Sequence, residues 1–292
     1  MFREASTVDV GACLRSQVAI VGAGPAGIAL SRALAKAGVS CLLLESGGVR
    51  PDAASDQLNA GTSTTGEYPF IPSRARAFGG STTRWYGACV ALDPVDFEVR
   101  DWIAHSGWPI RADDLAAYEK AARRFLRLPA ESAPGPEGDL AGELDADLLV
   151  KQVYHSDPLD IGKSYQQEAQ AARETTCLLR ATVTNIVRDE AGVVQRLDLR
   201  RPDGETFFVE ASCFVLAAGG LENPRLLLAS RDRDARGIGN ARDVVGRYHM
   251  ERPIRSVGVL QVGNAGRVAR ILADRRRGGG GKTEVKLGLT TE

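Results

Sequence analysis

The sequence predicts an α/β fold that opens with a parallel strand–helix–strand unit, and three observations support it. Residues 18–21 form an apolar run without alternation, as expected for a parallel strand buried on both faces. From Pro25 to Gly38, apolar residues recur at helical spacing, with proline in the first turn and glycine after the last. A second apolar run, from Val39 to Leu44, ends at Glu45. A glycine turn joins the first strand to the helix, which completes a βαβ unit.

The middle of the chain predicts three antiparallel strands followed by one more buried strand. Residues 178–187, 193–199 and 206–209 are β-branched or alternating, and the turn sequences EAG and PDG separate them. Residues 213–218 then form an apolar run that ends in Gly219. We interpret this run as another buried strand that ends in glycines.

Composition and charge exclude several classes of function. The 292 residues are 43% hydrophobic and 25% charged, which is typical of a globular chain of about two domains. Basic and acidic residues both number 37, so no net charge attracts nucleic acid or an anionic membrane. The five cysteines and three histidines lack metal-ligand spacing, and we expect no metal. With no signal peptide and no transmembrane segment visible, we expect a cytoplasmic protein.

The segment from Gly22 to Gly27 fits the pattern GxGxxG between a strand and a helix. The first glycine permits a tight turn, the second lets the backbone approach a pyrophosphate, and the third allows the helix to pack closely on the strand. The helix N-terminus adds free N–H groups and a partial positive charge. Glu45 is placed to accept hydrogen bonds from a ribose. The unit therefore predicts a Rossmann-type dinucleotide site, which by itself fits NAD or FAD.

Several further segments accompany this unit. They are Arg76–Trp85 (RAFGGSTTRW), Gly107–Pro109 (GWP), Val215–Arg225 (VLAAGGLENPR) and Val245–Arg247 (VGR). Together with the glycine turn and Glu45, they resemble the glucose-methanol-choline (GMC) oxidoreductases, over residues 17–253. The sugar-oxidising branch, with pyranose oxidase and the large subunits of sugar dehydrogenases, is the most similar. An NAD-dependent enzyme, the alternative, would continue with further βα repeats.

The resemblance implies a division of the chain into a leader and two domains. Residues 1–15 form the leader. Residues 16–84 and 165–250 form a Rossmann-like FAD-binding domain that includes the three-stranded antiparallel meander. Residues 85–164 and 251–292 form part of an incomplete α+β substrate domain.

The resemblance also implies which residues contact FAD. Gly79 and Gly80, followed by small hydroxyl residues, suit close approach of backbone to a flat ring and a phosphate. Val183 is expected to lie against the adenine through its backbone. The full set is Gly22, Gly24, Pro25, Ala26, Gly27, Glu45, Ser46, Arg76, Gly79, Gly80, Ser81, Thr82, Val183, Ala217, Ala218 and Gly219. Some members of the branch attach the flavin covalently to a histidine, but Arg84 stands at that position here. We therefore expect noncovalent FAD.

The implied reaction is oxidation of an alcohol group of a sugar or polyol, with hydride transfer to the flavin. Relatives carry their catalytic histidine in a C-terminal segment, and we expect this sequence to lack that segment. His249 is expected to be structural, and His105 and His155 solvated, so we assign no catalytic residue. The alternative is a non-catalytic flavin-binding fragment, or one half of a split enzyme whose partner chain supplies the rest.

A phosphate-loop reading of Gly281-Lys282-Thr283 fails on its context. The pattern GxxxxGK[ST] requires a glycine where Arg276 stands, and a helix where the sequence is strand-like. We therefore expect no nucleotide hydrolysis.

Overall fold

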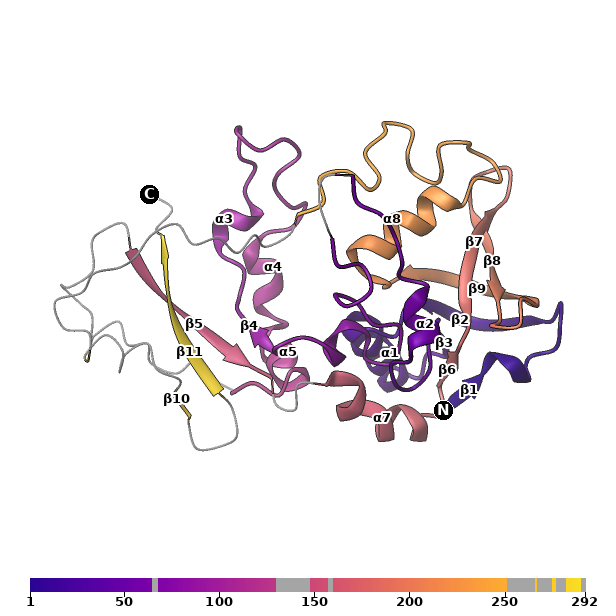
Figure 1. The fold of residues 1–292 in the computed structure, drawn as a ribbon, viewed down its shortest axis with the longest axis horizontal. Helices are drawn as coiled ribbons and strands as arrows, with labels where there is room; N and C mark the ends of the chain where they lie inside the picture. The colour runs from indigo at the N-terminus through magenta and orange to yellow at the C-terminus, as the bar shows by residue number, and fades with distance from the viewer. Residues whose placement is uncertain are drawn as a thin grey trace. The chain divides into compact units, whose positions relative to one another are not determined.

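The computed structural model describes residues 1–64, 68–129, 148–156 and 160–250, with residue 266 and residues 275–276 and 282–289. The chain divides into two compact units (Figure 1). The first unit comprises Met1–Arg84 and Asp160–Pro253, and the second comprises Trp85–Leu159 and Ile254–Glu292. The assignment of one unit to the cofactor and the other to the substrate stays a prediction.

A seven-stranded sheet of order β1-β6-β3-β2-β9-β8-β7 forms the first unit. The five strands from β1 to β9 pair in parallel, and β9, β8 and β7 pair in antiparallel. Their bounds are β1 (Phe2–Glu4), β2 (Cys13–Val21), β3 (Cys41–Leu44), β6 (Thr175–Leu179), β7 (Thr182–Arg188), β8 (Val194–Arg200) and β9 (Thr206–Leu216). The predicted α/β fold with an antiparallel meander is therefore confirmed.

Burial explains the position of the central strands. All four residues of β3 are buried, as are the last three of β2, which pairs with β3 on one side and β9 on the other. Helix α1 (Pro25–Lys36) packs on β3, and α8 (Gly219–Ala229) packs on β7. Fully buried Leu178, Leu197 and Phe207 belong to one core cluster that spans parallel and antiparallel strands. This unit also contains the helical segments α2 (Ala53–Gln57), η2 (Gly80–Thr83) and α7 (Ile161–Ala171).

The strand boundaries differ from the sequence prediction at two places. The predicted strand at residues 178–187 is two strands, because Arg180, with φ of 52°, turns the chain between β6 and β7. The predicted strands at 206–209 and 213–218 are instead one continuous strand, β9. It pairs with β8 from Thr206 to Glu210 and with β2 from Phe208 to Leu216. Local sequence patterns do not show either boundary, because pairing with neighbouring strands determines where each strand begins and ends.

Residues 1–15 are not a separate leader. Strand β1 pairs in parallel with β6, a single 3-10 turn η1 (Ala5–Thr7) follows, and β2 begins at Cys13. Ala5 and Val8 are 0% and 2% exposed within the core cluster. Three residues of strand carry too little periodicity to be recognised in sequence, but their burial makes this segment part of the first unit.

The second unit contains a four-stranded sheet of order β10-β11-β5-β4. Its elements are β4 (Ala88–Cys89), α3 (Pro94–Phe97), α4 (Ala112–Ala116), α5 (Glu119–Phe125), β5 (Leu148–His155), β10 (Arg275–Arg276) and β11 (Lys282–Leu289). Because β11 begins at Lys282, a strand stands where a phosphate loop would require a helix. Among the residues that the structure describes, no helix combines the length and hydrophobicity that crossing a membrane requires.

The turn between β2 and α1 depends on the absence of side chains. Gly22 has φ of +102°, and a Cβ there would lie 2.7 Å from the carbonyl oxygen of Ala217, at the end of β9. A Cβ on Gly27 would lie 2.0 Å from the carbonyl oxygen of Gly22. The turn, the helix and two strand ends can therefore meet only through bare backbone.

We expect Gly27→Ala to lower the free energy of unfolding by about 1–3 kcal/mol or more, because the added methyl forces the helix away from the turn. Gly24→Ala is the matched control, since its Cβ would meet no atom within 4 Å. Thermal or denaturant unfolding of the ligand-free proteins measures both changes. Equal stability of the two variants would contradict the packing described here.

Candidate dinucleotide-binding site

A cleft of about 570 Å³ opens in the first unit at the carboxyl ends of β2, β3 and β9. This edge is where ligands bind in open α/β sheets. The cleft brings together most of the residues predicted from sequence. These are Gly22, Gly24, Pro25, Ala26, Glu45, Ser46, Arg76, Gly80, Ser81, Val183, Ala217, Ala218 and Gly219.

Three predicted residues lie behind the cleft wall. Gly27 packs against the carbonyl oxygen of Gly22, and the N–H of Gly79 donates to the carbonyl oxygen of Ala23 at 2.8 Å. The hydroxyl of Thr82 donates to the carbonyl oxygen of Gly79 at 2.6 Å. These residues shape the turn and the loop and do not line the cavity.

The floor of the cleft is bare backbone at the start of α1. Gly24 is the N-cap of this helix, Pro25 follows in the first turn, and a Cβ on Gly24 would project into open space. A Cβ on Gly80 would lie 2.9 Å from the Cα of Gly24, so the loop rests directly on the turn. A helix N-terminus that faces an open space without side chains has the charge and the room to hold a diphosphate.

Glu45 lies at the end of β3 and is 5% exposed. Its carboxylate accepts hydrogen bonds from the N–H of Ala23 at 3.0 Å and from the N–H of Gly47 at 2.9 Å. Burial raises the pKa of this carboxyl above its ordinary value, and these two bonds oppose the rise. Oε1 also accepts from the Ser46 hydroxyl at 3.4 Å. Oε2 accepts only from Ala23 and keeps a further lone pair, so Glu45 can still accept from a ligand hydroxyl at the cleft wall.

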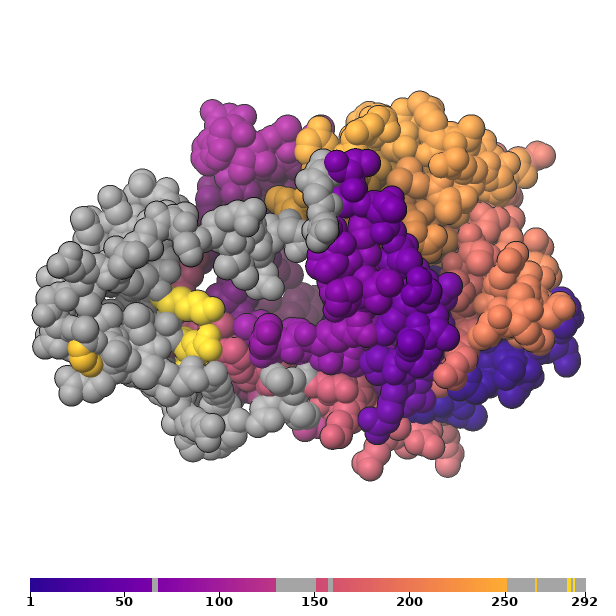
Figure 2. Space-filling view, viewed as in Figure 1, coloured from indigo at the N-terminus to yellow at the C-terminus, as the bar shows by residue number. Residues whose placement is uncertain are grey.

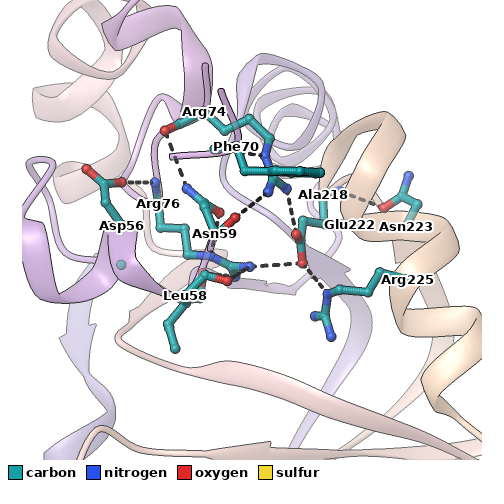
Figure 3. Close-up of polar contacts among 12 residues, drawn as sticks. Asp56, Leu58, Asn59, Phe70, Arg74, Arg76, Ala218, Glu222, Asn223 and Arg225 are labelled. Carbon is teal, nitrogen blue, oxygen red and sulfur yellow. Dashed lines mark hydrogen bonds and ion pairs between the residues drawn. The ribbon is translucent and has the colours of Figure 1, made fainter. Parts of the chain in front are cut away.

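Arg76 was expected to contact FAD, but its guanidinium is bound mainly by protein groups. Its guanidinium donates to Asn59 Oδ1 at 2.8 Å, to Ser46 Oγ at 3.0 Å and to the carbonyl oxygen of Leu58 at 3.2 Å. It also pairs with the carboxylate of Glu222 at 2.9 Å. Arg76 lines the cleft, but protein groups occupy most of its donors, as Figure 3 shows. Its main effect is to hold the loop after α2 against α8.

Glu222 is the centre of a charge cluster that the sequence analysis did not assign. Besides Arg76, its carboxylate receives Arg74 at 2.6 Å and Arg225 at 2.7 Å (Figure 3). Burial raises the pKa of Glu222, but the three arginines outweigh it and the net shift is downward. The sequence ENPR marked this helix, yet Arg74 lies 148 residues away, so no local pattern could pair them.

Asn223, also missed, closes the turn between β9 and α8. Its Oδ1 accepts from the N–H of Ala218 at 2.9 Å, and its Nδ2 donates to the carbonyl oxygen of Leu216 at 3.3 Å. The strand end that lines the cleft is thereby fixed in place. An Asx-type residue after a strand that ends in glycine was the available sequence signal.

Comparison with known proteins identifies the family. Residues 17–237 match the model of the FAD dependent oxidoreductase family, DAO. The chain belongs to this family. Over 74 residues it is 39% identical to the fructose dehydrogenase large subunit of Gluconobacter japonicus, which covers 25% of this chain and 14% of that protein. These matches confirm the predicted cofactor, FAD, and the resemblance to the GMC oxidoreductases.

A solved structure shares the fold. Pyridoxine 4-oxidase from Mesorbium loti matches with a TM-score of 0.52 and 21% identity, over 74% of this chain and 52% of that one. Formate oxidase is less similar, with a TM-score of 0.46 and 15% identity, over 76% and 48% of the two chains. The chain spans about half the length of these two proteins.

Arg84 is the residue for which the resemblance predicts the position of flavin attachment in some relatives. Its guanidinium donates to the carbonyl oxygens of Ile71 and Arg74, both at 2.7 Å, and pairs with the carboxylate of Asp56. Arg84 does not belong to the residues that line the FAD cleft. It therefore stabilises the loop that carries Arg74 and Arg76.

None of the three histidines lines the cleft. His249 is exposed, and its ring lies edge-on to that of Tyr68, with the ring centroids 6.3 Å apart. In Figure 2, the orange segment that ends near residue 250 adjoins the purple loop that precedes Arg84. His105 is exposed, as predicted. The prediction for His155 is wrong. It is the last residue of β5, its side chain is 12% exposed, and its Nε2 lies 3.4 Å from the carboxylate of Glu284.

The two cleft carboxyls should give opposite pH dependence of stability. The pKa of Glu45 is higher in the folded chain than its ordinary value of 4.5, so unfolding releases a proton as pH rises above that value. Its contribution to stability therefore falls with rising pH through the folded pKa. The pKa of Glu222 is lowered, so its contribution is present above 4.5 and is lost as pH falls through the folded pKa.

As pH rises, we expect the free energy of unfolding of the native chain to fall relative to that of Glu45→Gln. Relative to that of Glu222→Gln, it should rise. Urea unfolding of the ligand-free proteins between pH 3.5 and 8 measures both, on the order of 1 kcal/mol per pKa unit. The same sign for both variants would contradict the arrangement.

Proposed function

We propose that this chain binds FAD in the cleft of the first unit and serves in the oxidation of an alcohol group of a sugar or polyol. The observation that carries the proposal is the backbone floor at Gly24 and Gly80, at the N-terminus of α1. A dinucleotide needs such a floor for its diphosphate and an acidic residue for its ribose. Glu45 meets the second requirement at the end of the neighbouring strand.

The residues of the chain bind and orient the cofactor. The glycine turn and helix N-terminus hold the diphosphate, Glu45 accepts from the ribose, and the backbone around Val183 lies at the adenine. Gly80 and Ser81 lie at the flavin side of the cleft. When bound, FAD supplies the acceptor for hydride from the carbon that carries the hydroxyl group. All of these contacts use groups that line one cavity.

A sugar or polyol is the proposed substrate class. The 39% identical stretch belongs to a protein named for fructose dehydrogenation, and the motifs that carry the resemblance are those of the sugar-oxidising branch. The same relative is a large subunit, which supports a partner chain for this protein as well.

Removal of the hydroxyl proton requires a base, and the described part of the cleft offers none. Its carboxylates, Glu45 and Glu222, are committed to backbone N–H groups and to three arginines. A base positioned at the substrate contributes about 10²- to 10⁴-fold to the rate. We propose that a further segment outside this sequence, or a partner chain, supplies it. A flavin-binding half of a split enzyme is the second candidate.

FAD should remain with the purified chain through gel filtration and give a flavin spectrum. Gly24→Val should abolish this retention, because the side chain fills the space of the diphosphate. The stability of the ligand-free variant should stay close to that of the native chain, since its Cβ meets no neighbour. Absence of flavin under all conditions, together with tight NAD binding, would refute the proposal.

The FAD should be noncovalent, because Arg84 lacks a nucleophilic imidazole and is tied to the loop. After precipitation with acid, the yellow colour should stay in the supernatant. Colour that remains in the pellet would show a covalent link.

The chain alone should show little or no sugar or alcohol dehydrogenase activity with an artificial electron acceptor. Supplying the second half of a relative, fused or as a separate chain, should restore turnover. His249→Ala should change neither result, because His249 contacts Tyr68 and does not line the cleft. Rapid turnover by the isolated chain that His249→Ala abolishes would overturn both assignments.

A further inference from the structure

Arg225 differs from the other two arginines of the Glu222 cluster in its donors. Its Nε donates to Glu222 at 2.7 Å, and its terminal nitrogens have no partner among the residues that the structure describes. Its side chain is 53% exposed, whereas Arg74 and Arg76 are 17% and 11% exposed. Arg225 lines the cleft, and Figure 3 shows Glu222 bound at one edge of its guanidinium.

The cluster lies at one end of the cleft. Arg76 donates to Ser46, the neighbour of Glu45, and shares the Glu222 carboxylate with Arg225. Helix α8, which carries Glu222 and Arg225, packs on β7, the strand of Val183. On the proposed orientation of FAD, Glu45 and Val183 mark the ribose and the adenine. Arg225 therefore belongs to the adenosine end and not to the diphosphate floor at Gly24.

We propose that Arg225 contacts the adenine of FAD through its guanidinium plane and that Glu222 is the residue that positions it. The inference rests on the proposed binding of FAD in this cleft. A planar guanidinium stacks on a flat aromatic ring, and a base is such a ring. Glu222 binds only the Nε edge of Arg225, which fixes the plane and leaves the terminal nitrogens available for the ligand.

The arrangement of charges indicates that Glu222 positions Arg225 and does not merely compete with the ligand for its guanidinium. Three guanidinium groups around one partly buried carboxylate would repel one another without it. Arg74 and Arg76 bind Glu222 to the loop that carries them, and Glu222 in turn holds Arg225 at the cleft. Loss of the carboxylate should therefore release Arg225 and weaken adenosine binding.

Titration calorimetry of the full chain with ADP and with adenosine tests the inference. Arg225→Ala should weaken binding of both ligands about tenfold, with the same loss at low and high salt. Arg225→Lys, which keeps the charge but not the plane, should recover little of it. Arg200→Ala, at the exposed last residue of β8 and outside the cleft, is the matched control and should bind as the native chain does.

Glu222→Gln should weaken adenosine binding to a similar degree, and the double variant with Arg225→Ala should lose nothing further. Such non-additivity distinguishes a positioning residue from a structural one, whose effect would add. Unchanged adenosine binding by Arg225→Ala would overturn the inference, as would a loss confined to ADP and sensitive to salt, which indicates a phosphate contact. If the native chain binds neither FAD nor ADP, the proposed function itself fails.

Discussion

Contact between bare backbone segments at the start of α1 is the constraint on which the rest of the first unit depends. Gly22 lies against the end of β9, Gly27 against Gly22, and Gly80 against Gly24. These contacts set how closely the helix approaches the sheet and leave the helix N-terminus open to the cleft. A methyl group at Gly22, Gly27 or Gly80 would push apart the segments that form the floor. The stability of the fold and the shape of the site therefore rest on the same glycines.

Ion pairs, not apolar packing, join the opposite end of the cleft. The loop with Arg74 and Arg76 reaches α8 through Glu222, and Arg84 ties the same loop to Asp56. Ion pairs that are this poorly exposed lose hydration, so their net contribution to stability is small, but breaking one partner leaves an unpaired charge. Their effect here is to specify a single arrangement of loop and helix around the cavity. That arrangement holds Arg225 at the cleft.

The family and the cofactor rest on more of the chain than the substrate does. The FAD dependent oxidoreductase match covers residues 17–237, which include every strand of the seven-stranded sheet except β1 and the first residues of β2. The relation to a sugar dehydrogenase rests on 74 residues. The cleft that we propose for the cofactor is lined by groups within one unit. Hydride transfer and proton transfer belong to different groups because the flavin carries the redox chemistry, whereas proton transfer needs a separate base.

Short-range patterns in the sequence determined the βαβ unit, the glycine turn, the acidic residue at the end of β3 and the α/β class. Each of these rests on residues close together in the chain, where periodicity and backbone conformation act directly. Tertiary structure alone decided the rest. Three-residue strand β1 exists because β6 pairs with it, and Arg180 divides one apolar run into two strands. The His155 side chain is only 12% exposed and lies beside Glu284, which is far along the chain. The partners of Glu222 come from segments some 150 residues apart, as the 148-residue separation from Arg74 shows, and only the folded sheet brings their charges together.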